Sequence, residues 1–421
     1  MQNEVVKIRL LRFKIPRYVT CPFCSKRQPF KKEKEHYKLV KDINLDRPIL
    51  FKVRVVYAKC KNPECSHQSF VLPTPGIDRY QRSTQRLKDE AVTGIVSDNS
   101  TTPRIAQRLN RSFNTTGSKS AIDRWKHEAA DKLDIKEIIS RLGFSGILCI
   151  DEYKPKRATG YDLIDSDSKT SRILYLEKAY GLGRGIVKEH FQTVKALGIK
   201  PWAIIFDMRA CFPKAAKTVF GKDIIIQHDY FHVMKTIHYH LNRAMAEYRK
   251  ILQGMEINTL DIWFARWIIL KNMERWSVKE RAIIENLMHR YKGTTIEDIL
   301  ILKQKIRNIF LQSKSQQEAY TKRDELTAKN WQIKNRHFAN IIKFLNTSYF
   351  KYMTTFLDHP EIPRSGNSEN VIRTWRQMEK VRYGFKSDKG RIDHLKLYRL
   401  QKYLKNEFSP VHKILPYPDE E

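Results

Sequence analysis

The stretch Ile147–Asp151, with the sequence ILCID, is a short run of apolar residues that ends in an acid. Two later stretches repeat this arrangement. Trp202–Phe206 runs directly into Asp207, and Ile224–Ile226 leads through two residues to Asp229. Continuous apolar runs separated by helical segments are typical of buried strands in a mixed sheet. Because such sheets place their chemistry at strand ends, we expect a functional site near these acids.

The residues around these runs complete the pattern of an α/β domain. Tyr161–Ile164 and Ile173–Leu176 are predicted as two further strands, between the first and second apolar runs. Helices are predicted over Val187–Leu197 and around Pro213–Phe220. Alternation of strands and helices over residues 143–235 indicates the first part of an α/β core.

The next region is helical in pattern and interrupts this core. Residues 236–350 are rich in lysine and include Trp263, Trp267 and Trp276, and we interpret them as an all-helical insertion. Pro360 then breaks the pattern before a helix resumes over Glu369–Lys380. We expect residues 351–405 to form the second part of the core and residues 406–421 to form an irregular tail.

Three acids in this arrangement suit metal-dependent cleavage of DNA. Two magnesium ions about 3.5–4 Å apart stabilise both the entering and the leaving oxygen of a phosphodiester. Magnesium prefers oxygen ligands, so carboxylates are the expected anchors. Asp151 and Asp207 end neighbouring predicted strands, and Glu369 lies in the first turn of a helix that is able to pack beside them. Each acid alone is ordinary, since strand ends and first helical turns often carry one.

Four cysteines in the N-terminal region predict a structural zinc site. Cys21 and Cys24 are separated by two residues, and Cys60 and Cys65 by four. Four thiolates close a tetrahedral zinc site of the zinc-ribbon kind over residues 1–80. The second spacing is wider than the usual two residues, so His67 is an alternative ligand. The alternating stretch from Phe51 to Tyr57 predicts a strand that leads to Cys60. Cys149 and Cys211 are interpreted as structural thiols outside this site.

Residues 81–142 have the pattern of a helix-turn-helix. Helices are predicted over Arg86–Ser97, Thr102–Asn110 and Ser118–Lys132, with capping residues at their starts. An ordinary small helical bundle explains the pattern equally well. The cations expected to contact DNA are Lys119, Arg124 and Lys126 on the last of these helices and Arg373, Arg376, Lys380 and Arg382 near the catalytic glutamate. For the second group, with Trp375 among them, a core helix with a solvated basic face is the alternative.

The net charge indicates a polyanionic partner. Lysine and arginine number 79 against 46 acids, which gives +33. A charge of this size, interleaved with aromatic residues, is typical of nucleic-acid binding. Membrane surfaces are a weaker alternative, and no apolar run long enough to span a bilayer occurs. We expect a cytoplasmic, nucleoid-associated protein, without a membrane partner, in which cysteines are thiols or metal ligands.

The motifs together resemble a known family. They are Asp151-Glu152, Phe206-Asp207-Met208, the Asp229-x-x-His232 stretch and Ser365–Glu369. In this order they resemble the ISL3 family of insertion-sequence transposases, which belongs to the DDE superfamily and has Mutator-like relatives. The resemblance implies a multidomain α+β protein with a zinc ribbon, a helix-turn-helix and a ribonuclease-H-like core that a helical insertion interrupts. It also implies magnesium-dependent cleavage and strand transfer at the terminal inverted repeats of an element.

The resemblance leaves the second acid of the triad open. In a ribonuclease-H-like sheet that acid follows the fourth strand, and counting strands selects Asp207. Asp229 follows the fifth strand and is the rival, with His232 as an auxiliary residue. We therefore predict a transposase that acts on double-stranded DNA, and a homodimer on DNA is expected by analogy. A non-catalytic regulator derived from a transposase and a nuclease that cuts without joining are the alternatives.

Overall fold

The computed structural model divides the chain into two compact units. The first unit comprises Met1–Leu142 and Trp375–Glu421, and the second comprises Gly143–Thr374. The structure describes residues 7–11, 13–44, 47–74, 77, 81–113, 118–154, 160–381, 384–385 and 387–404. Arg382 and the tail predicted at 406–421 lie outside these described residues.

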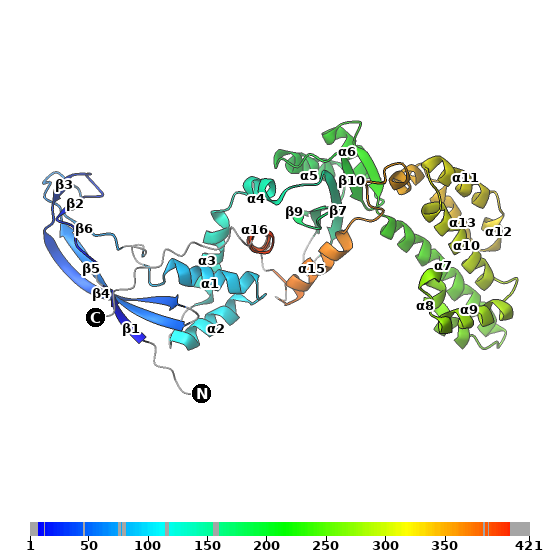
Figure 1. The fold of residues 1–421 in the computed structure, drawn as a ribbon, viewed down its shortest axis with the longest axis horizontal. Helices are drawn as coiled ribbons and strands as arrows, with labels where there is room; N and C mark the ends of the chain where they lie inside the picture. Colours follow the sequence, from blue (N-terminus) through cyan, green and yellow to red (C-terminus); the bar gives the residue numbers. More distant parts are fainter. Residues whose placement is uncertain are drawn as a thin grey trace. The chain divides into compact units, whose positions relative to one another are not determined.

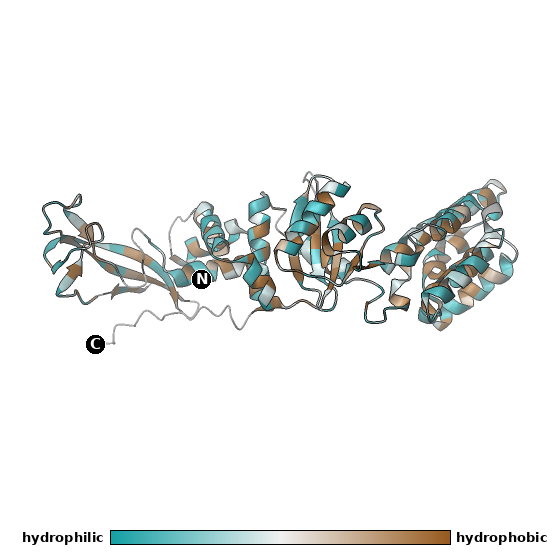
Figure 2. Ribbon diagram, turned by 90° about the horizontal axis from the view of Figure 1, so that it is seen from above, coloured by the Kyte–Doolittle hydropathy of each residue, from teal (hydrophilic) through white to brown (hydrophobic). Residues whose placement is uncertain are grey.

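The first unit begins with a long β-ribbon that the sequence only partly predicts. Its strands are β1 (Lys7–Leu11), β4 (Lys32–Asn44), β5 (Arg47–Lys59) and β6 (Ser69–Val71), with β5 central between β1 and β4 and also paired to β6. β2 (Tyr18–Thr20) and β3 (Arg27–Pro29) form a separate hairpin. Hydropathy alternates along β5, where Phe51 and Val53 are buried and Lys52 is exposed (Figure 2). The two-residue period of a half-buried strand holds from Ile49 to Val55 and then shifts by one residue, because Val56 and Ala58 are also buried.

The helices that follow pack with the C-terminal helix of the chain. They are α1 (Gln85–Val96), α2 (Thr102–Phe113), α3 (Lys119–Asp131) and α4 (Ile135–Leu142). The first three agree closely with the predicted helices, whereas α4 was not predicted. The hydroxyls of Thr84 and Ser118 cap α1 and α3. α16 (Asp388–Tyr403) contacts α1, α3 and α4, and Figure 1 shows it beside them in red.

The region 351–405, which we expected to form one part of the core, is instead shared between the two units. The second unit ends at Thr374, and the residues from Trp375 onward belong to the first unit. The reason is apolar packing, because Leu400 and Leu404 form a buried cluster with residues of α4. No local pattern in the sequence predicts this long-range contact.

A five-stranded mixed sheet forms the centre of the second unit. Its strands are β7 (Ile147–Tyr153), β8 (Tyr161–Asp167), β9 (Ile173–Ala179), β10 (Ala203–Phe206) and β11 (Ile225–His228), in the spatial order β11-β10-β7-β8-β9. β7, β10 and β11 are parallel, and β8 is antiparallel to both of its neighbours. All five strands lie where the apolar runs predicted them.

Helices α5 (Arg184–Ala196) and α6 (Cys211–Phe220) contact each other and pack beside the sheet (Figure 1). The ring of Phe206 on β10 stacks against Phe212 on α6, with ring centres 5.1 Å apart. Phe191 on α5 meets Phe212 edge to face. Successive side chains of a strand point to opposite faces. The face of β10 that carries Phe206 is therefore covered, and the neighbouring positions Ile205 and Asp207 point to the other face.

A body of helices follows the sheet, as the sequence predicts. It contains α7 (Tyr230–Gly254), α8 (Leu260–Leu270), η1 (Met273–Arg275), α9 (Val278–Arg290), α10 (Thr295–Leu311), α11 (Gln316–Thr327), α12 (Trp331–Lys334), α13 (Arg336–Leu345), α14 (Phe350–Met353) and η2 (Thr355–Leu357). These helices share one hydrophobic cluster that includes Ile237, Leu302 and Phe338. Among the described residues, no helix is both long and apolar enough to cross a membrane.

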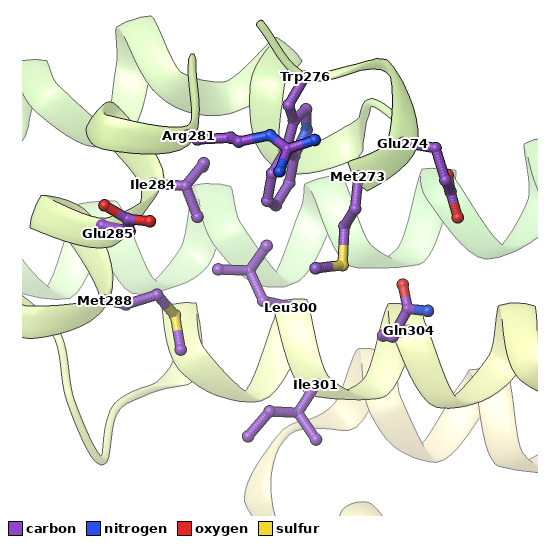
Figure 3. A pocket seen from close by; sticks show the side chains of 10 residues that line it. All are labelled: Met273, Glu274, Trp276, Arg281, Ile284, Glu285, Met288, Leu300, Ile301 and Gln304. Atoms are coloured by element: carbon purple, nitrogen blue, oxygen red, sulfur yellow. The ribbon is translucent and has the colours of Figure 1, made fainter. Parts of the chain in front are cut away.

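A hollow of about 760 Å³ lies on this helical body, between η1, α9 and α10. Ile284 and Met288 of α9 and Leu300 of α10 line it from facing helices (Figure 3). Its lining residues all come from 273–304, so it contains none of the predicted catalytic acids. The hollow is a feature of the helical body and not the candidate active site.

Candidate active site

Three acids lie in one row beside the three parallel strands of the sheet. Asp151 lies within β7, two residues before its end, and Asp207 and Asp229 directly follow β10 and β11. Ile150 of β7 pairs with Phe206 of β10, and Phe206 pairs with His228 of β11. The residues that come next are Asp151, Asp207 and Asp229. Adjacent strands lie about 4.8 Å apart, so the backbone of Asp207 lies between those of the other two acids. The predicted convergence of Asp151 and Asp207 thus follows from the strand pairing.

The segment that leads to Glu369 crosses the sheet on the side to which these acids point. A Cβ atom added to Gly366 would lie 2.6 Å from the Sγ of Cys149 and 3.6 Å from a methyl of Ile205. Cys149 and Asp151 are two residues apart on β7 and share a face. Asn367 also donates to the carbonyl of Ser168 at 2.6 Å. The close approach at Gly366 therefore brings α15 (Ser368–Val381), which carries Glu369, to the acidic face.

Burial makes Asp151 an acid of unusual affinity for protons. Burial is the main cause that raises its pKa to about 6. The carboxylates of Asp207 and Asp229 raise the pKa further, while nearby His232 lowers it. Such an electronegative, partly dehydrated group of oxygen ligands suits a hard divalent cation. The donor set therefore fits magnesium.

Glu152 is a neighbour of this site whose role the sequence did not reveal. Burial raises its pKa to about 7, against the opposing effect of the Arg209 guanidinium. Nε of Arg209 donates to Oε2 of Glu152 at 2.7 Å. This ion pair ties β7 to the loop that follows Asp207. In the sequence, Asp151 and Glu152 are only two adjacent acids. The sequence does not show which of them forms an ion pair with an arginine.

Asp207 and Asp229 both accept a backbone N–H through Oδ1, and Asp207 does so from Met208 at 2.6 Å. Asp229 differs in its greater burial and in a second contact. It is buried, its Oδ1 accepts from the N–H of Phe231 at 2.9 Å, and its Oδ2 accepts from the hydroxyl of Ser368 at 3.3 Å. The first contact caps α7, and the second holds the residue directly before Glu369. Nδ1 of His232 lies 3.7 Å from Oδ2 of Asp229. Both carboxylate oxygens of Asp229 therefore accept hydrogen bonds, one from α7 and one from α15.

Further hydrogen bonds fasten the same segment to β11. Gln227 accepts from the N–H of Phe356 at 2.9 Å and donates to the carbonyl of Arg364 at 3.2 Å. The N–H of Tyr230 donates to that carbonyl at 3.1 Å. These side chains were not identified from the sequence, because their partners lie more than 120 residues away in the chain.

The three carboxylates predicted as metal ligands do not form a compact ligand group among the described residues. Among the described residues, only the four cysteines form a group of three or more potential metal ligands whose atoms all lie within 4.8 Å. Glu369 is exposed, whereas Asp151 is buried and Asp207 is half-buried. Asp151 and Asp207 therefore lie in one row of the sheet, and Glu369 lies on the helix whose first residue, Ser368, contacts Asp229.

The cysteine cluster has the dimensions of a closed site. The Sγ atoms of Cys21 and Cys65 lie 3.9 Å apart, and those of Cys24 and Cys60 lie 3.7 Å apart. A tetrahedral zinc site with Zn–S bonds of about 2.3 Å has edges of about 3.8 Å. The four thiols therefore fit zinc.

The residues considered as alternatives lie elsewhere. His67 stacks on Phe23 with ring centres 3.6 Å apart, and its Nδ1 lies 3.0 Å from the Ser66 hydroxyl, so it is not part of the four-thiol group. Cys149 is buried, and burial is the main cause that raises the pKa of its thiol to about 12. Cys211 donates to the carbonyl of Leu182. Both of these thiols lie outside the cluster, as predicted.

One predicted DNA contact on α3 is wrong. Lys126 is buried, and its Nζ donates to the carbonyl of Gly390 on α16 at 2.6 Å. It stabilises the packing of α3 on α16 and is not available to a phosphate. Lys119 and Arg124 are exposed, and Arg124 lies 3.6 Å from Glu128. The sequence around Lys126 does not show that this side chain is buried, because the helix that covers it, α16, lies more than 250 residues later in the chain.

On α15 the structure favours a core helix with a basic outer face. Trp375 is completely buried and stacks against Phe385, so it is not available to contact DNA. Arg373, Arg376 and Lys380 are exposed. These three cations stay candidates for phosphate contact.

Comparison with known proteins places these features in a family. The family model described as a transposase of the DDE, ISL3 type matches residues 148–390, which is more than half of the chain. The chain is also similar to the solved Drosophila P element transposase strand transfer complex, with 11% identity, a TM-score of 0.43, and coverage of 74% of this chain and 91% of that one. None of the curated proteins matches the chain. By the family match over its sheet, its helical body and its glutamate helix, the chain belongs to the ISL3 family of DDE transposases.

Proposed function

We propose that this protein cleaves DNA at the terminal inverted repeats of an insertion sequence and joins the ends to target DNA. The observation that carries the proposal is the row formed by Asp151 within β7 and Asp207 directly after β10, on the face that the Gly366 segment crosses. The spatial strand order β11-β10-β7-β8-β9 supports a ribonuclease-H-like core, in which β10 is the fourth strand in chain order. Asp207 is accordingly the second acid.

In this proposal Asp151, Asp207 and Glu369 hold the catalytic metal. When bound, two magnesium ions would stabilise charge on the attacking and leaving oxygens of the phosphodiester. Asp151 supplies a buried carboxylate, and Asp207 supplies one at the adjacent strand end. Glu369 supplies the third from the first turn of α15. The exposure of Glu369 leaves room for DNA and metal to complete the site together.

Asp229 has a positioning role in this proposal. Its two oxygens contact Phe231 and Ser368, and so it connects the start of α7 to the start of α15. A carboxylate engaged in this way is a poorer metal ligand than Asp207. His232 remains an auxiliary residue, because burial opposes its protonation but the hydrogen bond to Asp229 and the nearby acids outweigh this and raise its pKa.

The first unit is proposed to recognise the element ends. Four thiols of suitable spacing would hold a structural zinc ion, and α1 to α3 would act as the helix-turn-helix. Lys119 and Arg124 are the exposed cations of α3 that would face DNA. The net charge of +33 agrees with a polyanionic partner.

The test is a cleavage and strand-transfer assay on the element's own ends with magnesium. Asp151→Asn, Asp207→Asn and Glu369→Gln are each expected to lower the rate by about a thousandfold or more, since each removes a charge needed for metal binding. Asp229→Asn should keep measurable activity. Loss of activity in Asp229→Asn with activity retained in Asp207→Asn would overturn the assignment of the second acid.

The same assay separates the other activities. A regulator without catalysis would bind the ends and cleave nothing under any metal. A nuclease would give cut ends and no joined product. Joined product from the wild type, absent in the three triad variants, is the result that the transposase proposal requires.

A further inference from the structure

Exposed aromatic and cationic side chains alternate along α7. At the start of the helix, Nζ of Lys235 lies 5.9 Å from the ring centre of Phe231. Farther along, the guanidinium of Arg243 lies 6.0 Å from the ring centre of Tyr239. The partners in each pair are four residues apart, so they share one side of the helix. Phe231 and Tyr239 are 42% and 57% exposed.

The same arrangement continues onto α8, which contacts α7. The guanidinium of Arg249 lies 4.8 Å from the ring centre of Trp263. Arg266 lies 4.6 Å from Trp263 and 4.4 Å from Trp267. Trp267 is 69% exposed, although tryptophan is ordinarily well buried. Large aromatic side chains gathered at the surface in this way mark an interaction site.

The charges on these helices identify the class of partner. The sequence of α7 contains a single acid, Glu247, and that acid pairs with Arg336. Asp261, the single acid of α8, pairs with Arg290 at 2.9 Å. Within the described part of the chain, Arg243 and Arg266 form no ion pair with a carboxylate. A second copy of this chain would oppose like charges here, whereas a nucleic acid supplies both phosphates and flat bases.

We propose that this row binds unpaired nucleotides of a DNA strand. Its members are Phe231, Lys235, Tyr239, Arg243, Arg249, Trp263, Arg266 and Trp267. The cations contact phosphates, and the exposed rings stack on bases, a contact that tolerates any sequence. We call these eight residues the aromatic–cation row.

The position of the row gives it a role beside the acids. α7 begins at Tyr230, directly after Asp229 at the end of β11, and its 25 residues extend for about 37 Å. A strand that leaves the acidic face of the sheet can therefore follow α7 outward. This inference rests on the proposed function and adds to it the path of a single strand that is freed from the duplex at the element end.

The test measures DNA binding without cleavage. Zinc-loaded full-length protein in magnesium-free buffer is titrated into a fluorescent duplex of the element end, either blunt or with a single-stranded tail of about ten nucleotides. The wild type should prefer the tailed duplex. Trp267→Ala and Tyr239→Ala should each weaken binding of the tailed duplex about tenfold, since one stacked base contributes a factor of this size. Binding of the blunt duplex should change less than about twofold.

A salt titration supplies a second measurement that is independent of stacking. Arg243→Gln should lower the slope of log affinity for the tailed duplex against log salt by about 0.7, the value for one phosphate of a single strand. The matched controls are Lys279→Gln and Val278→Ala on α9 of the same helical body, both at exposed positions outside the row. Neither control should alter the preference for the tail or the salt slope.

Two results would overturn the proposed binding of unpaired nucleotides, and one further variant separates it from the proposed function. A tail preference and salt slope unchanged in Trp267→Ala and Arg243→Gln would overturn the inference. A change from dimer to monomer in Trp267→Ala, seen by light scattering without loss of tail preference, would assign the row to protein contact and also overturn it. Asp207→Asn separates this inference from the proposed function, because that variant should lose cleavage and keep the tail preference.

Discussion

The cysteine cluster and the carboxylate site both gather potential metal ligands, but the fold assembles them to different degrees. The four thiols are within 4.8 Å of one another, whereas the three acids form no such group among the described residues. Two cysteine pairs, each with a short spacing, bring the thiols together. Asp207 follows Asp151 by 56 residues in the chain, and Glu369 follows Asp207 by 162 residues. The cysteine cluster is thus already compact in the fold, whereas the carboxylates that we propose as catalytic are not.

The largest effect that tests this difference is removal of zinc. Cys60→Ser, or a zinc chelator, is expected to unfold the region around β2, β3 and β6, because structural zinc in small domains contributes about 10–16 kcal/mol of apparent binding free energy. Zinc content and limited proteolysis measure this loss. Cys211→Ser is the matched control, since Cys211 lies outside the cluster. A Cys60→Ser protein that retains one zinc per chain would contradict the four-thiol assignment.

At the carboxylate site, removing a ligand should stabilise the metal-free protein, whereas removing a cysteine ligand should destabilise its region. Burial raises the pKa of Asp151 to about 6 from its ordinary value of 3.8. The charged form is thus disfavoured in the folded protein, and stability should fall as pH rises from about 4 to about 6 and then stay low. Asp151→Asn removes the charge and should stabilise the metal-free protein by about 1–3 kcal/mol at pH 8 while abolishing cleavage.

Chemical denaturation in metal-free buffer at several pH values checks this. Asp223→Asn, at an exposed position, is the control and should leave the pH profile unchanged. Added magnesium should stabilise the wild type and not Asp151→Asn, since only the former binds the ion. A metal-free Asp151→Asn protein that is less stable than the wild type would show that this carboxylate is part of the packing and not a strained ligand.

The two sites also differ in how far the sequence predicts them. The cysteine spacing and the acids after the apolar runs are local patterns. The four cysteines form the expected cluster, whereas β7 continues two residues beyond Asp151, so this acid lies within a strand. The catalytic role of the acids stays a prediction. The position of Glu369 depends on residues 355–368, whose hydrogen bonds reach β11 through Gln227 and reach Asp229 through Ser368. The pattern of apolar residues in the sequence does not show such long-range contacts. The three carboxylates could therefore be named from the sequence, but the distances between them could not be predicted.

The same reasoning explains the errors at the surface. Lys126 has the spacing of a DNA-facing cation, yet it donates to Gly390, which lies 264 residues later in the chain. β4 lacks a clear apolar alternation, because its residues Lys32–Tyr37 are exposed on both faces of the ribbon. Its pairing with β5 defines it as a strand, and that pairing is not visible in β4 alone.

A smaller effect is expected where the glutamate segment touches the sheet. Gly366→Ala would place a methyl group 2.6 Å from the Sγ of Cys149, so the segment or the strand must move. We expect a loss of about 1–3 kcal/mol in stability and a fall in cleavage rate as α15 shifts. Cys149→Ala in the same chain removes the clashing sulfur and should restore much of both. Denaturation and cleavage measured on the four proteins of this cycle check it, and purely additive effects would contradict a direct contact.

The smallest effect concerns the hydrogen bond between Ser368 and Asp229. Ser368→Ala removes a donor from a buried carboxylate oxygen and is expected to cost about 1 kcal/mol, because the remaining oxygen is left without that partner. Ser368→Thr keeps the hydroxyl and is the control. If Asp229 only positions α15, Ser368→Ala should slow cleavage severalfold without altering its dependence on magnesium concentration. If Asp229 binds metal instead, Ser368→Ala frees its oxygen and should change the dependence of the cleavage rate on magnesium concentration. A magnesium titration of Ser368→Ala and Ser368→Thr therefore distinguishes a positioning role of Asp229 from a role as a metal ligand.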